Sequence, residues 1–253
     1  MTGPFPEPRL VRTDFPLFFL DSVDSTNTFM KEWSRRSSLQ QGTALYAGIQ
    51  TSGRGRPGNK WQHFQGNLAL SLWVAREGDT ECGIPWTLKG AFVLLEVLSG
   101  LGVPCGLKYP NDIWLKDQSG KIAGILVEKV QKGWIIGIGV NRTAPPGSTR
   151  IGAWEDLPDM HQLAFLYSRQ LFQRFLSNNP PFLLESEILE RLNRVLLWKG
   201  RWVSWKAPNG PLIGKIIQIG KTGRLEVKTP DGGNIMLPET VRSFELLETI
   251  HGK

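Results

Sequence analysis

The chain has 253 residues, of which 40% are hydrophobic and 21% charged, so it has enough apolar material for a packed core and is not globally disordered. No apolar run approaches the roughly 18 residues that a membrane-spanning helix needs. The first residues also lack the apolar core of a secretion signal, so we expect a cytoplasmic protein with no membrane partner. The net charge of +7 suits phosphorylated ligands, nucleic acid or an acidic protein partner.

The first half of the chain is predicted to alternate strands with helices. Its first twenty residues are rich in Pro and Phe and predict an irregular lead-in. Asp24 and Ser25 are favourable N-cap residues for a helix, and Pro85 suits the start of a later one, with Gly100 or Gly102 near its end. The pattern predicts strands at 18–23, 44–50 and 67–75 and helices at 25–36 and 85–102.

The second half is predicted to begin with a meander of three strands, at 112–116, 121–130 and 133–141, joined by short turns. Two helices follow, and the second places Leu184, Ile188, Leu192 and Val195 on one face. We therefore expect residues 1–198 to form an α+β domain with a mixed, largely antiparallel sheet.

From Lys199 onward the chain consists of short β-like runs. They are separated by the hairpin signals PNG, KTG and DGG at a spacing of roughly ten residues. This pattern predicts a small β-barrel domain at residues 199–253.

A glycine-rich loop follows the strand that ends at Gln50. Gly53, Gly55 and Gly58 allow backbone N–H groups to approach an anion, and Arg54 and Arg56 supply forked donors for phosphate or carboxylate. The glycines also match the dinucleotide pattern G-x-G-x-x-G, but that pattern must open a helix, and here a strand follows. We interpret the segment as an anion-binding loop.

Three of the four other motifs have an ordinary structural explanation when taken alone. DSTN (24–27) is a helix cap, KYPND (108–112) a turn, and KIAGILVE (121–128) a strand with a solvated lysine at its start. Glycines in the strand motif GIGVN (137–141) suggest close approach by another group. Cys82 and Cys105 predict reduced thiols, and His63, His161 and His251 form no catalytic grouping.

The order and spacing of the five motifs resemble the biotin–protein ligases over Phe19–Asn141. The match is nearest to the short form of that family, which lacks an N-terminal DNA-binding domain. The resemblance implies a class II synthetase-like catalytic domain whose sheet is flanked by helices, followed by a small SH3-like β-barrel. It also implies activation of biotin with ATP and Mg²⁺ to biotinyl-5′-AMP. The biotinyl group would then pass to a lysine of the biotin carboxyl carrier protein of acetyl-CoA carboxylase.

The resemblance assigns roles residue by residue. The catalytic residues would be Lys121, Arg56 and Asp112, and Asp112 is also the candidate for Mg²⁺ and for a general base. The biotin-binding residues would be Ser25, Thr26, Asn27, Gln50, Arg54, Gly55, Arg56 and Lys121. The residues for ATP and the adenylate would be Arg54, Arg56, Trp61, Lys108, Asn111 and Asn141.

Three positions depart from the family pattern, and three other functions stay open. Tyr109 stands where tryptophan is commoner, Pro57 replaces a frequently basic residue, and His63 lies in an atypical stretch. The alternatives are a lipoate–protein ligase, a nucleic-acid-binding protein or biotin-responsive repressor, and an inactive biotin-binding module. DNA is not expected, because no recognition helix or ordered basic–aromatic array is visible. The sequence leaves monomer or homodimer undecided.

Overall fold

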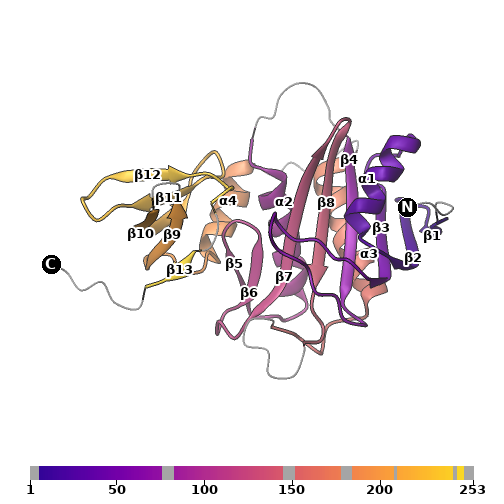
Figure 1. Ribbon diagram of the computed structural model, residues 1–253, viewed down its shortest axis with the longest axis horizontal. Coiled ribbons are helices and arrows are strands. Elements are labelled where there is room, and N and C mark those ends of the chain that lie inside the picture. The colour runs from indigo at the N-terminus through magenta and orange to yellow at the C-terminus, as the bar shows by residue number, and fades with distance from the viewer. Residues whose placement is uncertain are drawn as a thin grey trace.

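The computed structural model describes residues 6–75, 83–144, 152–177, 184–207, 210–241 and 244–247, so Cys82 and His251 lie outside the described residues. Eight described strands form the central sheet (Figure 1), in the order β1-β2-β3-β4-β8-β7-β6-β5. Among them only β2 and β3 pair in parallel. The predicted mixed, largely antiparallel sheet is confirmed. The strands are β1 (Arg9–Arg12), β2 (Leu17–Val23), β3 (Ala44–Gln50), β4 (Leu68–Ala75), β5 (Cys105–Lys108), β6 (Asp112–Leu115), β7 (Lys121–Val130) and β8 (Gly133–Val140).

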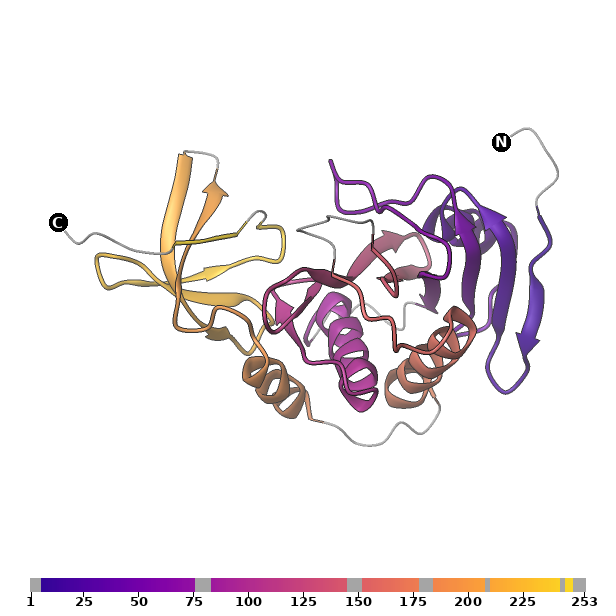
Figure 2. The ribbon, with the colours of Figure 1, turned by 90° about the horizontal axis from the view of Figure 1, so that it is seen from below.

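Helices cover both faces of this sheet. On β8, the side chain of Ile136 contacts Gly90 of α2, whereas the next residue, Gly137, lies against Asn27 of α1. Because successive strand residues point to opposite faces, α1 and α2 lie on opposite sides. In Figure 2, α2 and α3 lie below the sheet. The helices are α1 (Thr26–Arg36), α2 (Trp86–Gly100), α3 (Met160–Leu171), a π-helical turn (Phe172–Leu176) and α4 (Glu185–Arg194).

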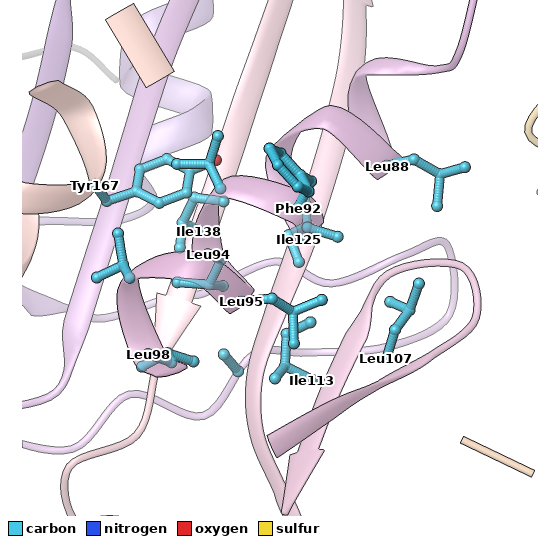
Figure 3. Close-up of a cluster of buried hydrophobic side chains, with 14 of the residues drawn as sticks. Leu88, Phe92, Leu94, Leu95, Leu98, Leu107, Ile113, Ile125, Ile138 and Tyr167 are labelled. Carbon is cyan, nitrogen blue, oxygen red and sulfur yellow. The ribbon is translucent and has the colours of Figure 1, made fainter. Parts of the chain in front are cut away.

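The larger core lies between the sheet and α2. This helix is apolar on nearly every side, because it packs on the sheet with one face and contacts α3 and α4 with the others. In Figure 3, Phe92 lies by Ile125 and Tyr167 by Ile138 in this layer, and Leu98 belongs to the same core. Each fully buried side chain of this size contributes about 1.5–3 kcal/mol, so the layer provides a firm base for the opposite face.

A smaller, five-stranded antiparallel sheet follows α4 and lies at the left of Figure 1. The predicted small C-terminal β domain is confirmed, while the limit at residue 198 stays a prediction. Gly223 and Gly232, in the KTG and DGG turns, have φ of +79° and +92°, a region that favours glycine. Its strands are β9 (Trp202–Ala207), β10 (Gly210–Ile219), β11 (Leu225–Lys228), β12 (Asn234–Leu237) and β13 (Glu245–Leu246).

Two predictions about local structure were wrong. The first twenty residues are not simply an irregular lead-in, because β1 pairs with β2 at the edge of the sheet. Cations fix this edge: the guanidinium group of Arg9 lies over the ring of Phe19 at 5.0 Å. The meander also has a further strand, β5, which pairs with β6. Within the described ranges, no helix combines the length and hydropathy of a membrane span.

Candidate functional site

A cavity of about 700 Å³ opens on the face of the sheet that carries α1. The start of α1, the glycine loop, the ends of several strands and the C-terminal residues Val241 and Phe244 line it. The glycine loop crosses in front of β7 and β8 in Figure 1. The cavity brings together all but one of the predicted site residues, namely Ser25, Thr26, Asn27, Gln50, Arg54, Gly55, Arg56, Trp61, Lys108, Asn111, Asp112 and Lys121.

The exception is Asn141, which is not among the described residues that line the cavity. Its side chain is buried beneath the end of β8, where the amide group donates to the carbonyl of Lys121 at 3.2 Å. The Nδ2 of Asn67 donates to its Oδ1 at 3.3 Å. Asn141 thus supports the backbone at the start of β7 instead of facing the cavity.

The start of α1 presents polar groups to the cavity. Ser25 is the N-cap residue, but its side chain caps no helix N–H among the described residues. Helix capping therefore does not account for this buried hydroxyl. The next residue, Thr26, donates its backbone N–H to Oε1 of Gln50 at 2.9 Å. This bond joins the start of α1 to the end of β3.

Behind this wall lies a continuous set of hydrogen bonds. The hydroxyl oxygens of Thr26 and Ser71 are 2.8 Å apart, and Ser71 Oγ is 2.5 Å from Oδ1 of Asn27. The amide nitrogen of Asn27 donates to Oε2 of Glu128 at 2.9 Å. Lys31, one helical turn beyond Asn27, bonds the other oxygen of Glu128.

Glu128 is a charged group with little access to water, since its side chain is 17% exposed. Burial by itself raises the pKa of Glu128, but the hydrogen bonds from Lys31 and Asn27 and the charges of Lys31 and Arg54 lower it further than burial raises it. The net pKa lies below the ordinary value of a glutamate, so the carboxylate is ionised at neutral pH.

Glycines in β8 make room for two of the site side chains. A Cβ added to Gly137 would lie 2.3 Å from Oδ1 of Asn27, and one added to Gly139 would lie 2.3 Å from the indole ring of Trp61. Contacts this short do not occur between real atoms, so only glycine fits at either position. The close approach predicted for GIGVN is therefore present.

The glycine loop folds back on itself and over the cavity. Arg54 forms an isolated bridge with Lys60, and a Cβ at Gly53 would lie 2.3 Å from the carbonyl oxygen of Trp61. Arg56 leaves the loop and donates to Oδ1 of Asn111 at 3.1 Å. Its other terminal nitrogen donates to the backbone carbonyls of Glu239 at 2.7 Å and Val241 at 3.2 Å. A cavity residue is thereby bonded to the C-terminal part of the chain.

Cationic side chains gather at the other end of the cavity. Nζ of Lys121 is 2.7 Å from Oδ1 of Asp112 and 5.4 Å from the centre of the Trp61 ring. Nζ of Lys108 lies 4.5 Å from the ring centres of both Trp114 and Trp198. In the described part of the chain, no group of three or more His, Cys, Asp or Glu side chains could hold a metal by itself.

Two of the departures from the family pattern have structural roles. Tyr109 is buried and donates its hydroxyl proton to the carbonyl of Gly223 in the small β domain, at 3.0 Å. Burial is the main cause of its raised pKa. His63 Nε2 is 3.2 Å from the carbonyl of Gly48, and burial lowers its pKa despite that contact. His161 pairs with the hydroxyl of Tyr46 at 2.7 Å.

Several residues of this site were not predicted from the sequence. Glu128 and Lys31 were not predicted, because an ordinary surface charge has the same appearance in a sequence. Ser71 left a detectable signal, since it is a polar residue within an otherwise apolar strand. Val241 and Phe244 left none, because they come from beyond the predicted catalytic domain.

Comparisons with known proteins point to one family. Residues 19–141 match the model of the biotin/lipoate A/B protein ligase family. The bifunctional ligase/repressor BirA of Escherichia coli is 39% identical over 129 residues, which are 48% of this chain and 39% of that protein. A biotin–[acetyl-CoA-carboxylase] ligase of Mycobacterium tuberculosis is 31% identical over 164 residues, covering 60% of this chain and 61% of that one.

The chain therefore spans about two fifths of the length of the BirA proteins that it matches. The structural similarity to solved proteins covers more of the chain than the sequence matches do. A biotin protein ligase from Aquifex aeolicus, solved in complex with biotin and ATP, superposes with a TM-score of 0.72 at 26% identity. That match covers 92% of this chain and 99% of the other, so it includes the small C-terminal β domain.

Proposed function

We propose, from the match of residues 19–141 to the model of the biotin/lipoate A/B protein ligase family, that this chain is an ATP-dependent biotin–protein ligase. The observation that carries the proposal is that one cavity of about 700 Å³ gathers twelve of the thirteen predicted site residues. Its two ends differ in chemistry. Neutral polar groups from the start of α1 line one end, and cations line the other.

The neutral end suits the ureido ring of biotin. A cyclic urea has two N–H donors and one carbonyl acceptor, and each needs a partner once the ring is buried. Ser25, Thr26, Asn27 and Gln50 supply hydroxyl and amide groups at this end. We assign these four residues to the ureido ring.

The cationic end suits the reacting carboxylate and phosphates. In the proposed first step, an oxygen of the biotin carboxylate attacks the α-phosphorus of ATP. A C–O–P bond forms, the bond to the β-phosphate oxygen breaks, and pyrophosphate leaves. No side-chain nucleophile is required, so the work of the enzyme is positioning and charge neutralisation. Arg56, Lys108 and Lys121 supply the positive charge at this end, Arg54 adds its charge from the glycine loop beside Glu128, and Trp61 and Asn111 flank the nucleotide.

In the proposed second step, the ε-amine of a lysine on a biotin carboxyl carrier protein attacks the acyl carbon of biotinyl-5′-AMP. An amide bond forms, AMP leaves, and the amine gives up one proton. Asp112 is the candidate base, since its carboxylate lies beside Lys121 in the cavity. The carrier domain of acetyl-CoA carboxylase is the proposed substrate, because the mycobacterial relative bears that name.

Magnesium is the proposed companion of ATP. Mg²⁺ usually keeps several waters and takes one or two carboxylates together with substrate phosphates. Asp112 fits that pattern, because it is a cavity carboxylate that lies among the phosphate-binding cations. When bound, the ion would neutralise charge on the phosphates.

One experiment tests the function and separates its rivals. The protein is mixed with biotin, Mg-ATP and a biotin carboxyl carrier domain, and mass spectrometry then looks for one biotinyl group on one lysine. Lipoate replaces biotin in a parallel reaction. Biotin-dependent modification supports the proposal. Modification with lipoate alone would reassign the chain to the lipoate ligases, and salt-sensitive, sequence-specific DNA binding would favour a repressor.

A further inference from the structure

The hydrogen-bond chain behind the cavity wall has a defined direction, and Glu128 sets it. An ionised carboxylate only accepts hydrogen bonds, so Asn27 must turn its NH₂ group to Glu128 and its carbonyl to Ser71. Ser71 has one hydroxyl proton, and Asn27 Oδ1 cannot donate, so that proton goes to Asn27. The hydroxyl of Thr26 has two acceptors in reach, Ser71 Oγ at 2.8 Å and Gln50 Oε1 at 3.2 Å, and because Ser71 has no proton left for the shorter contact, Thr26 donates to Ser71.

This direction determines what the wall offers to a ligand. The hydroxyl proton of Thr26 is directed at Ser71, so the remaining lone pairs of its Oγ1 can only accept. Oε1 of Gln50 already accepts the backbone N–H of Thr26, which leaves the NH₂ group of Gln50 as a donor. An acceptor and a donor side by side match the adjacent N–H and C=O of a cyclic urea.

The same carboxylate also reaches the glycine loop. Nη2 of Arg54 is 3.5 Å from Oε1 of Glu128, the oxygen that also binds Lys31. Arg54 is half-exposed, whereas Glu128 is largely shielded from water. Without the carboxylate, the hydrogen bonds behind the wall would therefore no longer have a fixed direction. Lys31 and Arg54 would also lose the anion that they share.

We propose that Glu128 is a positioning residue for biotin. Its carboxylate fixes the direction of the hydrogen bonds through Asn27 and Thr26, and it holds Arg54 of the glycine loop beside the same wall. The identity of the ligand rests on the proposed function, but the tie between Glu128 and the loop does not.

The test compares three variants of the full chain by two measurements. Calorimetry gives the affinity for biotin, and hydrogen exchange without ligand follows backbone amides 50–61. Glu128→Gln should weaken biotin binding about tenfold, in the range expected for lost bonds to a charged group, and should speed exchange in the loop. Ser71→Ala interrupts the series of hydrogen bonds but keeps the ion pair between Glu128 and Arg54. It should therefore weaken biotin binding and leave hydrogen exchange in the loop unchanged.

Glu32→Gln is the matched control. Glu32 is also paired with an arginine, Arg36 of the same helix, but it takes no part in the hydrogen bonds behind the cavity wall. It should change neither measurement. In turnover, Glu128→Gln should raise the KM for biotin more than the KM for ATP, and Glu128→Asp should recover part of the loss. If Glu128→Gln does not fold, the double variant with Lys31→Gln removes both partly buried charges and is measured in its place.

The outcomes are separable. If Glu128→Gln binds biotin as tightly as the control variant does, Glu128 does not position biotin through the direction of the hydrogen bonds. Loop exchange equal to that of the control would overturn the tie to Arg54. A wild-type chain that binds no biotin would sink the proposed function, while the exchange measurement would still decide the tie to the loop.

Discussion

The ammonium group of Lys121 lies between Asp112 and the face of the Trp61 ring. A compact charge held in this way can offset the negative charge that develops on the reacting phosphate. We predict that Lys121→Ala lowers biotin-dependent pyrophosphate exchange by about 10²–10³-fold. Lys121→Arg keeps the charge and should retain more activity. Near-normal exchange in the alanine variant would refute the assignment.

The guanidinium group of Arg56 spans the loop, Asn111 and two C-terminal carbonyls. We predict that Arg56→Ala leaves biotin binding measurable but speeds the release of biotinyl-AMP about tenfold, because charge-assisted bonds contribute about 1.5–3 kcal/mol each. Release is measured by chasing preformed labelled adenylate from the enzyme. Arg35→Ala, on the exposed side of α1, is the control, and equal release rates for the two variants would contradict the prediction.

At this scale, the sequence identified residues whose chemistry stands out in a recognisable motif. It could not identify Glu128, because the role of that carboxylate depends on its hydrogen bonds with Asn27 and Lys31, which lie about a hundred positions away in the sequence. Asn141 shows the converse. An amide at the end of a glycine-rich strand was assigned to the ligand, but the fold uses it to support Lys121. A motif supplies the residue type, and the direction of its side chain depends on packing.

At the scale of elements, β8 is a strand whose two faces have different tasks. Ile136 and Ile138 belong to the core under α2, whereas Gly137 and Gly139 receive side chains of the site. We predict that Gly139→Ala displaces the Trp61 ring and lowers adenylate formation at least tenfold, because an added Cβ would lie 2.3 Å from that ring. Pyrophosphate exchange and the tryptophan fluorescence spectrum report the two effects.

Gly100→Ala is the matched control for this prediction. Gly100 ends α2, and a Cβ there meets no described atom within 4 Å, so we expect unchanged activity and unchanged or slightly greater stability. Activity of Gly139→Ala equal to that of the control would show that Trp61 can move without cost.

Long, periodic elements were predicted well from the sequence, whereas two of the short strands were not. The helix at 85–102 and the strand at 121–130 match α2 and β7 closely. β1 and β5 have four residues each and were missed. Strands this short carry little periodicity of their own, since their stability comes from the partner strand and from tertiary contacts.

At the scale of the whole molecule, the small β domain is joined to the rest by specific polar contacts. Asn193 of α4 donates its side-chain amide to the carbonyl of Ile219 at 2.9 Å, and Oδ1 accepts the N–H of the same residue at 2.7 Å. Tyr109 adds a hydrogen bond to Gly223. These contacts hold the segment whose carbonyls bind Arg56.

We predict that Asn193→Ala lowers the free energy of unfolding by about 1–3 kcal/mol, because it leaves two partly buried backbone groups without their partner. Urea denaturation measures the change. Asn234→Ala is the control, since that side chain lies at the exposed edge of β12 and makes only a 3.5 Å contact with Glu226. Equal stability of the two variants would mean that the domain is held by apolar contacts alone.

The sequence predicted the presence of this second domain, but not its part in the site. Arg56 and Glu239 are 183 residues apart, and no local pattern links a loop arginine to a distant carbonyl. Contacts of this kind become visible only when both domains are placed together.

The parallel pairing of β2 with β3 has a consequence for engineering. Parallel strands end at the same edge of a sheet, so the residues that follow β2, Ser25 to Asn27, meet Gln50 at the end of β3. One contiguous stretch, 23–50, therefore supplies all of them. The cations come from elsewhere, chiefly from the glycine loop and the segment around β5 to β7. Under the proposed function, the residues for the ureido ring and most of those for the reacting phosphates are thus encoded in separate pieces of the gene. If that function holds, exchanging the stretch 23–50, together with Ser71 beneath it, is the natural route to a ligase for another acyl group.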